Sequence, residues 1–179
     1  MSFAHSESNT VEPATHDDAP TIRVSTGSGA GRTQLSAFDA ALRDAGVANF
    51  NLIRLSSVIP PRSEVRAVAP VDQLTGRHGD RLYCVYAEAH AELPYHEAWA
   101  GIAWALHDDG SGAGLFVEHE GPSKEQVDRD LTASLEDLIA GRGGGYTPAG
   151  RAFANAMCEH EPVCAVVVAS YVTQGWSDS

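Results

Sequence analysis

The sequence predicts an α/β protein in which helices cover the outer faces of antiparallel or mixed sheets. Two segments, 33–45 and 123–138, carry apolar residues at three- and four-residue spacing, as amphipathic helices do. Between and after them lie long runs rich in alanine, valine and aromatic residues, such as 81–91 and 97–107, separated by short polar turns. Consecutive strands with short turns favour antiparallel pairing, which gives the predicted class.

Length and composition predict one domain. The chain has 179 residues, 43% hydrophobic and 20% charged, so we expect a single domain over 21–179. The first twenty residues are rich in Ser, Thr, His, Asp and Pro, and we expect 1–20 to form a disordered tail. They contain no hydrophobic signal region, and no apolar run in the chain is long enough to span a membrane, so we expect no membrane partner. The three cysteines show no CxxC spacing, which predicts reduced thiols in a cytoplasmic protein.

Charge limits the class of ligand. A formal net charge of −12 argues against nucleic acid and anionic membrane surfaces as partners and suits a cationic ligand. The histidines show no HExxH or similar spacing, so we expect no metal site. Lys124 is the only lysine and lies at a predicted exposed helix start, which argues against pyridoxal phosphate chemistry, since that cofactor needs a lysine.

The amino-terminal elements are a strand, a glycine-rich turn and a helix. Residues 21–26 alternate as a strand, and 27–31 (GSGAG) predict a tight turn into the helix at 33–45. The turn does not match a dinucleotide fingerprint, because Arg32 occupies the third glycine position, and we expect no nucleotide site. The helix is expected to end at Gly46, and its apolar stripe is Leu35, Phe38, Leu42 and Ala45.

A short strand beginning near Phe50 runs into two adjacent serines, Ser56 and Ser57, and stops at two prolines. Pro60 disfavours a helical conformation for the residue before it, so the serine pair lies where an extended segment is forced to turn. In this position the Ser57 hydroxyl can attack the carbonyl of Ser56 and convert the amide into an ester. Elimination and hydrolysis would then leave a pyruvoyl group at 57. An ordinary exit from a strand has the same composition, so spacing alone leaves both interpretations open.

The remainder of the chain is strand-rich, with one more helix. Residues 151–160 fit a strand or a helix, so both stay open. The predicted elements are an extended piece at 65–71, a turn at 75–80, strands at 81–91, 97–107 and 115–120, a helix from Ser123 with the stripe Val127, Leu131, Leu135 and Leu138, and a strand at 163–172.

Three further residues are candidates for chemistry. Asn51 is the amide donor nearest in sequence to the serine pair, and such donors commonly stabilise a developing oxyanion. Glu118 is either the polar end of an edge strand or a general acid whose pKa is raised by a partly apolar pocket. Asp39 follows Phe38 on the first helix, where a solvated carboxylate is the ordinary interpretation.

Two segments resemble the pyruvoyl-dependent arginine decarboxylase family. The run 27–61 resembles its amino-terminal third, most specifically in the string Asn-x-Asn-Leu-x-x-x-Ser-Ser-x-x-Pro, and GLFVEHEG around Glu118 is similar to the same family. The resemblance covers most of 21–173. It implies a four-layer αββα sandwich, and trimers with sites between subunits.

The same resemblance implies roles for individual residues. It implies self-cleavage between Ser56 and Ser57 into a 1–56 β chain and a 57–179 α chain, with Ser57 becoming the covalent pyruvoyl cofactor. It also implies decarboxylation of L-arginine to agmatine and CO₂, with the pyruvoyl carbonyl as electron sink. In this scheme Glu118 protonates the substrate α-carbon, Asn51 aligns the cleavage site, and Asp39 holds the guanidinium.

Two alternatives remain. Ala48 and Phe50 stand where the family has smaller or aliphatic pocket residues; larger groups would narrow the cavity, so another amino acid is a possible substrate. The alternative from a different class is a non-processing binding or regulatory homologue. The presence of both serines, Asn51 and Glu118 argues against it. The physiological role of agmatine, in polyamine supply or in acid resistance, is open.

Overall fold

The computed structural model describes residues 20–69 and 74–176, and the expected tail at 1–20 therefore lies almost wholly outside the described residues, as does Val71. Within these ranges the chain forms nine strands and two helices. In chain order they are β1 (Thr21–Ala30), α1 (Gln34–Asp44), β2 (Asn51–Arg54), β3 (Val58–Ile59), β4 (Glu64–Ala67), β5 (Arg81–Ala91), β6 (Glu97–His107), β7 (Gly114–Gly121), α2 (Lys124–Gly141), β8 (Tyr146–Met157) and β9 (Val163–Gln174).

The strands form two sheets. Among the described residues, five strands make a mixed sheet in the order β2-β5-β9-β1-β4, and four make an antiparallel sheet in the order β3-β7-β6-β8. In the mixed sheet β1 pairs parallel with β4, and β2 pairs parallel with β5. The predicted α/β class with antiparallel and mixed sheets is confirmed. Because β2 and β3 belong to different sheets, the chain crosses from one sheet to the other between Arg54 and Val58.

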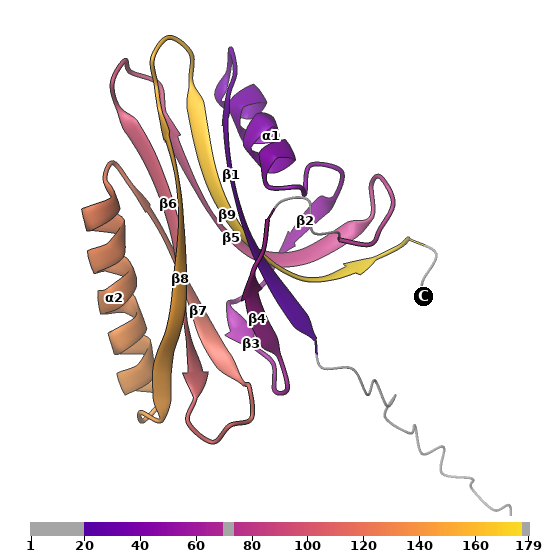
Figure 1. Cartoon of the computed structure of the whole chain (residues 1–179), viewed down its shortest axis with the longest axis vertical. Helices are drawn as coiled ribbons and strands as arrows, with labels where there is room; N and C mark the ends of the chain where they lie inside the picture. Colours follow the sequence, from indigo (N-terminus) through magenta and orange to yellow (C-terminus); the bar gives the residue numbers. More distant parts are fainter. Residues whose placement is uncertain (1–19, 70–73, 177–179) are drawn as a thin grey trace, which may run out of the picture.

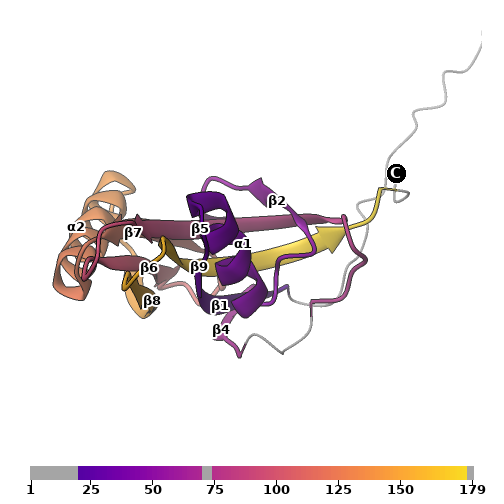
Figure 2. The same ribbon diagram turned by 90° about the horizontal axis from the view of Figure 1, so that it is seen from above.

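Three apolar clusters hold these elements together. The largest joins the two sheets through side chains such as Ile22, Ile102 and Phe116. The second packs α1 against the five-stranded sheet, and the third packs α2 against β6 and β7. Figure 1 shows the two helices on opposite sides of the molecule with the sheets between them, and Figure 2 shows the same arrangement from above.

The glycine-rich segment is part of a strand, so the predicted turn at 27–31 is wrong over most of its length. β1 continues through Ala30, because its glycines let α1 approach the strand closely. A Cβ atom at Gly27 would overlap the carbonyl oxygen of Ala41, and one at Gly29 would meet the Cβ of Ala40. These glycines therefore serve helix packing rather than chain reversal.

The first helix lies where it was predicted, and three members of its predicted stripe pack against the sheet: Leu42 and Ala45 are buried and Phe38 is partly buried. Thr33 caps the helix, with its side-chain oxygen accepting the Ser36 N–H at 3.1 Å. The predicted stripe is wrong at Leu35, which is 76% exposed, whereas Ala37 and Ala41 are buried against the sheet. Small side chains occupy this face because the glycine-containing strand lies so close.

The other elements agree more closely with the sequence. β5 and β6 have the predicted bounds, and 151–157 belongs to a strand rather than a helix. Ser123 caps α2 and accepts the Gln126 N–H at 3.3 Å, and the α2 stripe is buried at Val127, Leu131 and Leu135. Its last predicted member, Leu138, is 36% exposed at the end of the helix.

Candidate active site

Ser57 lies at the crossing between the sheets in a strained backbone conformation. Its φ is +66°, in the left-handed region that residues other than glycine rarely adopt. Such a conformation costs on the order of 1 kcal/mol and persists only where the surrounding structure enforces it. The enforcement comes from both sides, since β2 is paired with β5 just before this point and β3 with β7 just after it.

The hydroxyl of Ser57 donates a hydrogen bond to the carboxylate of Glu118. The distance between Ser57 Oγ and Glu118 Oε1 is 2.6 Å, and the two residues are 61 positions apart in the chain. Glu118 lies on β7, paired with Ile102 of β6, and is half-buried. The antiparallel pairing of β3 with β7 brings this carboxylate to the serine.

The surroundings of Glu118 favour its protonated form. Burial raises the pKa of this carboxyl above its ordinary value, and that effect outweighs three opposing ones. The hydrogen bond from Ser57 and the positive charges of Arg54 and His119 each lower the pKa. Arg54 is held close by, with its guanidinium 4.4 Å from the centre of the Tyr86 ring and bonded to the Tyr86 carbonyl. A carboxyl of this kind can accept the serine proton and return a proton at higher pH than a solvated one.

Main-chain and side-chain bonds fix the carbonyls beside Ser57. The N–H of Phe116 donates to the Ser57 carbonyl at 2.8 Å, and the Tyr171 hydroxyl donates to the Val58 carbonyl at 3.1 Å. Upstream, the Leu55 N–H donates to the Cys84 carbonyl at 2.9 Å. Sequence reasoning missed Phe116 and Tyr171. The apolar run ending in Tyr171 indicates only a buried strand, and no spacing rule connects it with residue 58.

The structure does not bring Asn51 or Asp39 to this pair. Asn51 is exposed at the other end of β2, and its side-chain amide donates to the Gly79 carbonyl at 2.6 Å. A cavity of about 740 Å³ lies beside this bond, lined by the 75–80 turn and by Trp176. We call Ser57 and Glu118 the inner half of the candidate site, and Asn51 and Asp39 the outer half.

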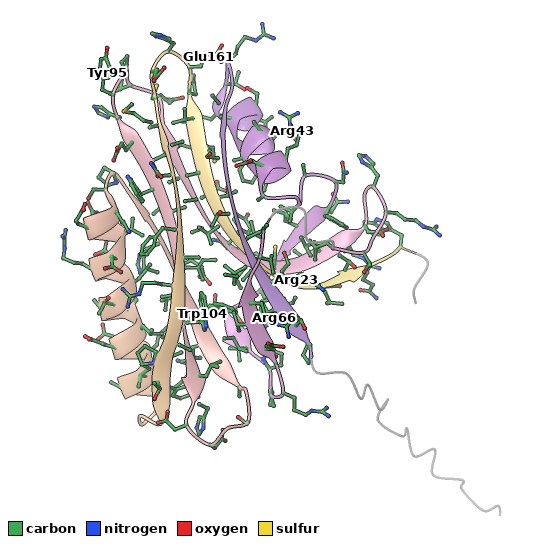
Figure 3. The ribbon with its side chains drawn as sticks, viewed as in Figure 1. Arg23, Arg43, Arg66, Tyr95, Trp104 and Glu161 are labelled. Atoms are coloured by element: carbon green, nitrogen blue, oxygen red, sulfur yellow. The ribbon has the colours of Figure 1, made fainter. Side chains whose placement is uncertain are left out.

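Asp39 lies on the exposed side of α1. Its carboxylate is 3.1 Å from the guanidinium of Arg43, one helical turn away, and more than half of each side chain is exposed. Figure 3 shows Arg43 on the outer side of the helix, pointing away from the sheets. The carboxylate is therefore available to a ligand or to another subunit, with Arg43 as its only competing ionic partner among the described residues.

Other chemistries find little support in the described parts of the chain. No group of three or more His, Cys, Asp and Glu side chains there could hold a metal ion. Lys124 begins α2, and its Nζ lies 5.3 Å from the centre of the Phe153 ring. Across 20–69 and 74–176, no helix is both long and apolar enough to cross a membrane.

Comparisons with known proteins find relatives of one family. The model of the family "Pyruvoyl-dependent arginine decarboxylase (PvlArgDC)" matches residues 21–174. A pyruvoyl-dependent arginine decarboxylase of Halobacterium salinarum is 36% identical over 152 residues, which cover 85% of this chain and 94% of the relative. One from Methanocaldococcus jannaschii is 36% identical over 112 residues, covering 62% of this chain and 65% of the relative. Pyruvoyl-dependent arginine decarboxylase 2 of Archaeoglobus fulgidus is 30% identical over 125 residues, covering 65% and 74%.

Proposed function

The chain belongs to the pyruvoyl-dependent arginine decarboxylase family, and from that premise we propose that it cleaves itself between Ser56 and Ser57 and decarboxylates L-arginine to agmatine and CO₂. The observation that carries the proposal is the 2.6 Å hydrogen bond from Ser57 Oγ to Glu118 Oε1. It joins a possible nucleophile to a possible proton acceptor at a strained peptide.

The residues present fit a pyruvoyl group at position 57. Such a group must come from a serine, and Ser57 supplies both its carbon skeleton and the attacking oxygen. The carbonyl that would remain as the amide of the group already accepts the Phe116 N–H. When formed, the group supplies the electron sink that loss of CO₂ requires.

The cleavage step needs no reagent other than water. Ser57 Oγ attacks the Ser56 carbonyl carbon as Glu118 takes the hydroxyl proton, the C–N bond breaks, and the freed amine takes a proton. Elimination across Cα and Cβ of residue 57 then breaks the ester C–O bond and releases a 1–56 chain with a free carboxylate. Water adds to the dehydroalanine left on the 57–179 chain, and ammonia leaves.

Glu118 then serves the decarboxylation as a proton donor. After CO₂ leaves, the substrate α-carbon needs a proton, and a carboxyl whose pKa is raised by burial holds one nearer to neutral pH. The same side chain is placed to accept the Ser57 proton before cleavage. A single carboxyl thus takes part in both reactions at one position.

Asn51 and Asp39 enter the site from a neighbouring subunit. Within one chain both side chains have local partners and lie away from the Ser57–Glu118 pair. Family resemblance implies trimers with sites between subunits, and a second copy can present its outer half to the inner half of the first. There Asn51 aligns the cleavage site, and the Asp39 carboxylate accepts two hydrogen bonds from the substrate guanidinium.

With the reaction we also propose a layer arrangement, a cellular compartment and a substrate charge. The three apolar clusters support a four-layer αββα sandwich formed by a single domain over 21–179. Cys84, Cys158 and Cys164 all lie in the described part of the chain and are free and buried, which supports a reducing, cytoplasmic compartment. The net charge of −12 supports a cationic substrate.

The intact mass of the purified protein under denaturing conditions is the first test. We expect two chains, one ending at Ser56 and one beginning with a pyruvoyl group in place of Ser57. A single uncut chain would contradict the proposal and favour the non-processing homologue. Release of CO₂ from arginine, ornithine, lysine and aspartate then tests the substrate, and equal turnover of arginine and ornithine would contradict the role of Asp39.

A further inference from the structure

Tyr171 lies at an irregularity in β9 beside the cleavage site. The pairing of β5 with β9 matches Tyr83 with Val172 and then Cys84 with Ser170, which leaves Tyr171 as an extra residue. A bulge of this kind bends the strand locally, and bulges are common next to active sites because they redirect a side chain. Here the redirected side chain leaves its own sheet and reaches β3 of the other.

The hydroxyl of Tyr171 contacts the residue that follows Ser57. It donates to the Val58 carbonyl at 3.1 Å, across 113 positions of sequence. Its ring packs against the cluster between the sheets and meets the Phe116 ring edge-on, with centroids 6.1 Å apart. Phe116 in turn donates its N–H to the Ser57 carbonyl at 2.8 Å. We call these two bonds, to successive carbonyls, the carbonyl clamp.

The clamp holds one side of the bond that breaks. The reaction requires Ser57 Oγ to approach its own preceding carbonyl, so rotation of residue 57 about its backbone must be restricted. The Phe116 and Tyr171 bonds restrict it from the downstream side while Glu118 holds the hydroxyl. Ser57 keeps a φ of +66°, which it would otherwise lose by relaxing.

The surroundings of the tyrosine favour its neutral, hydrogen-bond-donating form. Burial raises the pKa of its phenol well above the ordinary value, and the nearby Glu118 and Cys84 raise it further. The groups that lower the pKa of Glu118, apart from its Ser57 hydrogen bond, are Arg54 and His119. Because the hydroxyl donates its hydrogen bond to the Val58 carbonyl and not to the Ser57 side chain, its contribution here is to fix position.

We propose that Tyr171 is a positioning residue for self-cleavage, holding the Val58 carbonyl and, through the main chain, keeping Ser57 in the conformation from which it attacks. This inference rests on the proposed cleavage between Ser56 and Ser57. Tyr171 reaches the reacting serine only through the Val58 carbonyl, so its contribution is to the rate of the first step.

The test compares Tyr171→Phe with Tyr83→Phe. Both remove one partly buried phenol oxygen, and Tyr83 donates at 2.9 Å to Gln174 rather than to the cleavage segment. Newly translated precursor is followed by denaturing mass analysis, and hydroxylamine is added in parallel to intercept the ester, which reports the acyl shift alone. The midpoint of thermal unfolding is measured for each uncut protein.

We expect Tyr171→Phe to slow both cleavage and hydroxylamine capture by about tenfold, the effect of one hydrogen bond, with an unfolding midpoint like that of Tyr83→Phe. The Tyr83 variant should be cut at the wild-type rate. Cleavage of Tyr171→Phe at the wild-type rate would overturn the inference, and so would equal slowing of both variants with equal loss of stability. If the wild-type chain itself stays uncut, the proposed function fails and the inference fails with it.

Discussion

The two halves of the candidate site are built in opposite ways. The inner half, Ser57 and Glu118, comes from segments 61 positions apart, is partly buried, and is joined by a 2.6 Å bond. The outer half, Asn51 and Asp39, is exposed, and each side chain is bonded to a local neighbour. From this difference we expect one chain to supply the attacking serine and its proton acceptor, whereas Asn51 and Asp39 act only where a neighbouring subunit brings them to that pair. Substitutions in the two halves should therefore affect different steps.

The largest effect is expected from Ser57→Ala, which removes the attacking oxygen. This variant should remain a single uncut chain with no decarboxylase activity, as judged by denaturing mass analysis and CO₂ release. Ser56→Ala is the matched control, because it keeps the attacked carbonyl and should still be cut after residue 56. Cleavage of the Ser57 variant would exclude this residue as the nucleophile.

Glu118→Gln should lower kcat of processed enzyme by at least about 100-fold, the usual contribution of a general acid. The rate of the wild-type enzyme should fall as pH rises through the raised pKa of Glu118, because the proton-donating form disappears. The rate of Glu118→Gln should not show this decrease with rising pH. Glu120→Gln, two residues along the same strand and exposed, is the control. A wild-type pH profile in the Glu118 variant would argue against this role.

Asp39→Ala should leave cleavage intact and reduce kcat/KM for arginine, since the guanidinium loses its carboxylate. Mixing Asp39→Ala with Glu118→Gln subunits tests whether the halves meet across subunits. In randomly mixed trimers about one site in four would combine an intact inner half with an intact neighbouring outer half. Activity should therefore recover to about a quarter of wild type. If activity does not recover, Asp39 and Glu118 of one site belong to the same subunit.

The smallest effect concerns the stability of uncut protein. Because burial raises the folded-state pKa of Glu118 above its unfolded value, its ionisation costs the folded state free energy. Its favourable contribution is present below the unfolded pKa and is lost as pH rises through the folded pKa. The free energy of unfolding of Ser57→Ala, measured in urea, should decrease from about pH 4 to about pH 7. The double variant Ser57→Ala/Glu118→Gln should lack this decrease. Identical pH dependence would contradict the raised pKa.

Local sequence signals predicted the fold better than they predicted packing. The bounds of β5 and β6 follow from long apolar runs, and the start of α2 follows from its cap. The turn predicted at 27–31 was wrong because, in sequence, a glycine required for the close approach of a helix cannot be distinguished from one required for a turn. For the same reason the predicted stripe included the exposed Leu35, since nothing local shows how near the strand lies.

The site was predictable in part. The prolines predicted a turn at the serine pair but not the positive φ of Ser57, which depends on strand pairing on both sides of it. The resemblance singled out Glu118, which the structure places at hydrogen-bond distance. Tyr171 could not be found in this way, because its role depends on a bulge in β9 and on a contact with the other sheet. No pattern in the sequence showed that Asn51 and Asp39 would lie apart from Ser57 and bond to local neighbours.

The proposed cut falls where the chain passes from one sheet to the other, and this changes how the protein is held together. The 1–56 chain keeps β1 and β2 of the five-stranded sheet, with α1 packed on it, while the 57–179 chain keeps the four-stranded sheet entire. After cleavage β1 still lies between β9 and β4, and β2 still lies beside β5, so one sheet contains strands of two polypeptides, with β1 inserted between two strands of the other chain.

Such interleaving can be assembled readily only while the chain is continuous. Uncut protein regains its fold by a unimolecular reaction, whereas cleaved chains that have separated must meet again before β1 can insert between its neighbours. The recovery of mature protein after denaturation therefore depends on its concentration, and that of the uncut form does not. After cleavage the protein no longer refolds as one continuous chain. The lifetime of the mature protein is then set by the rate at which its two chains dissociate.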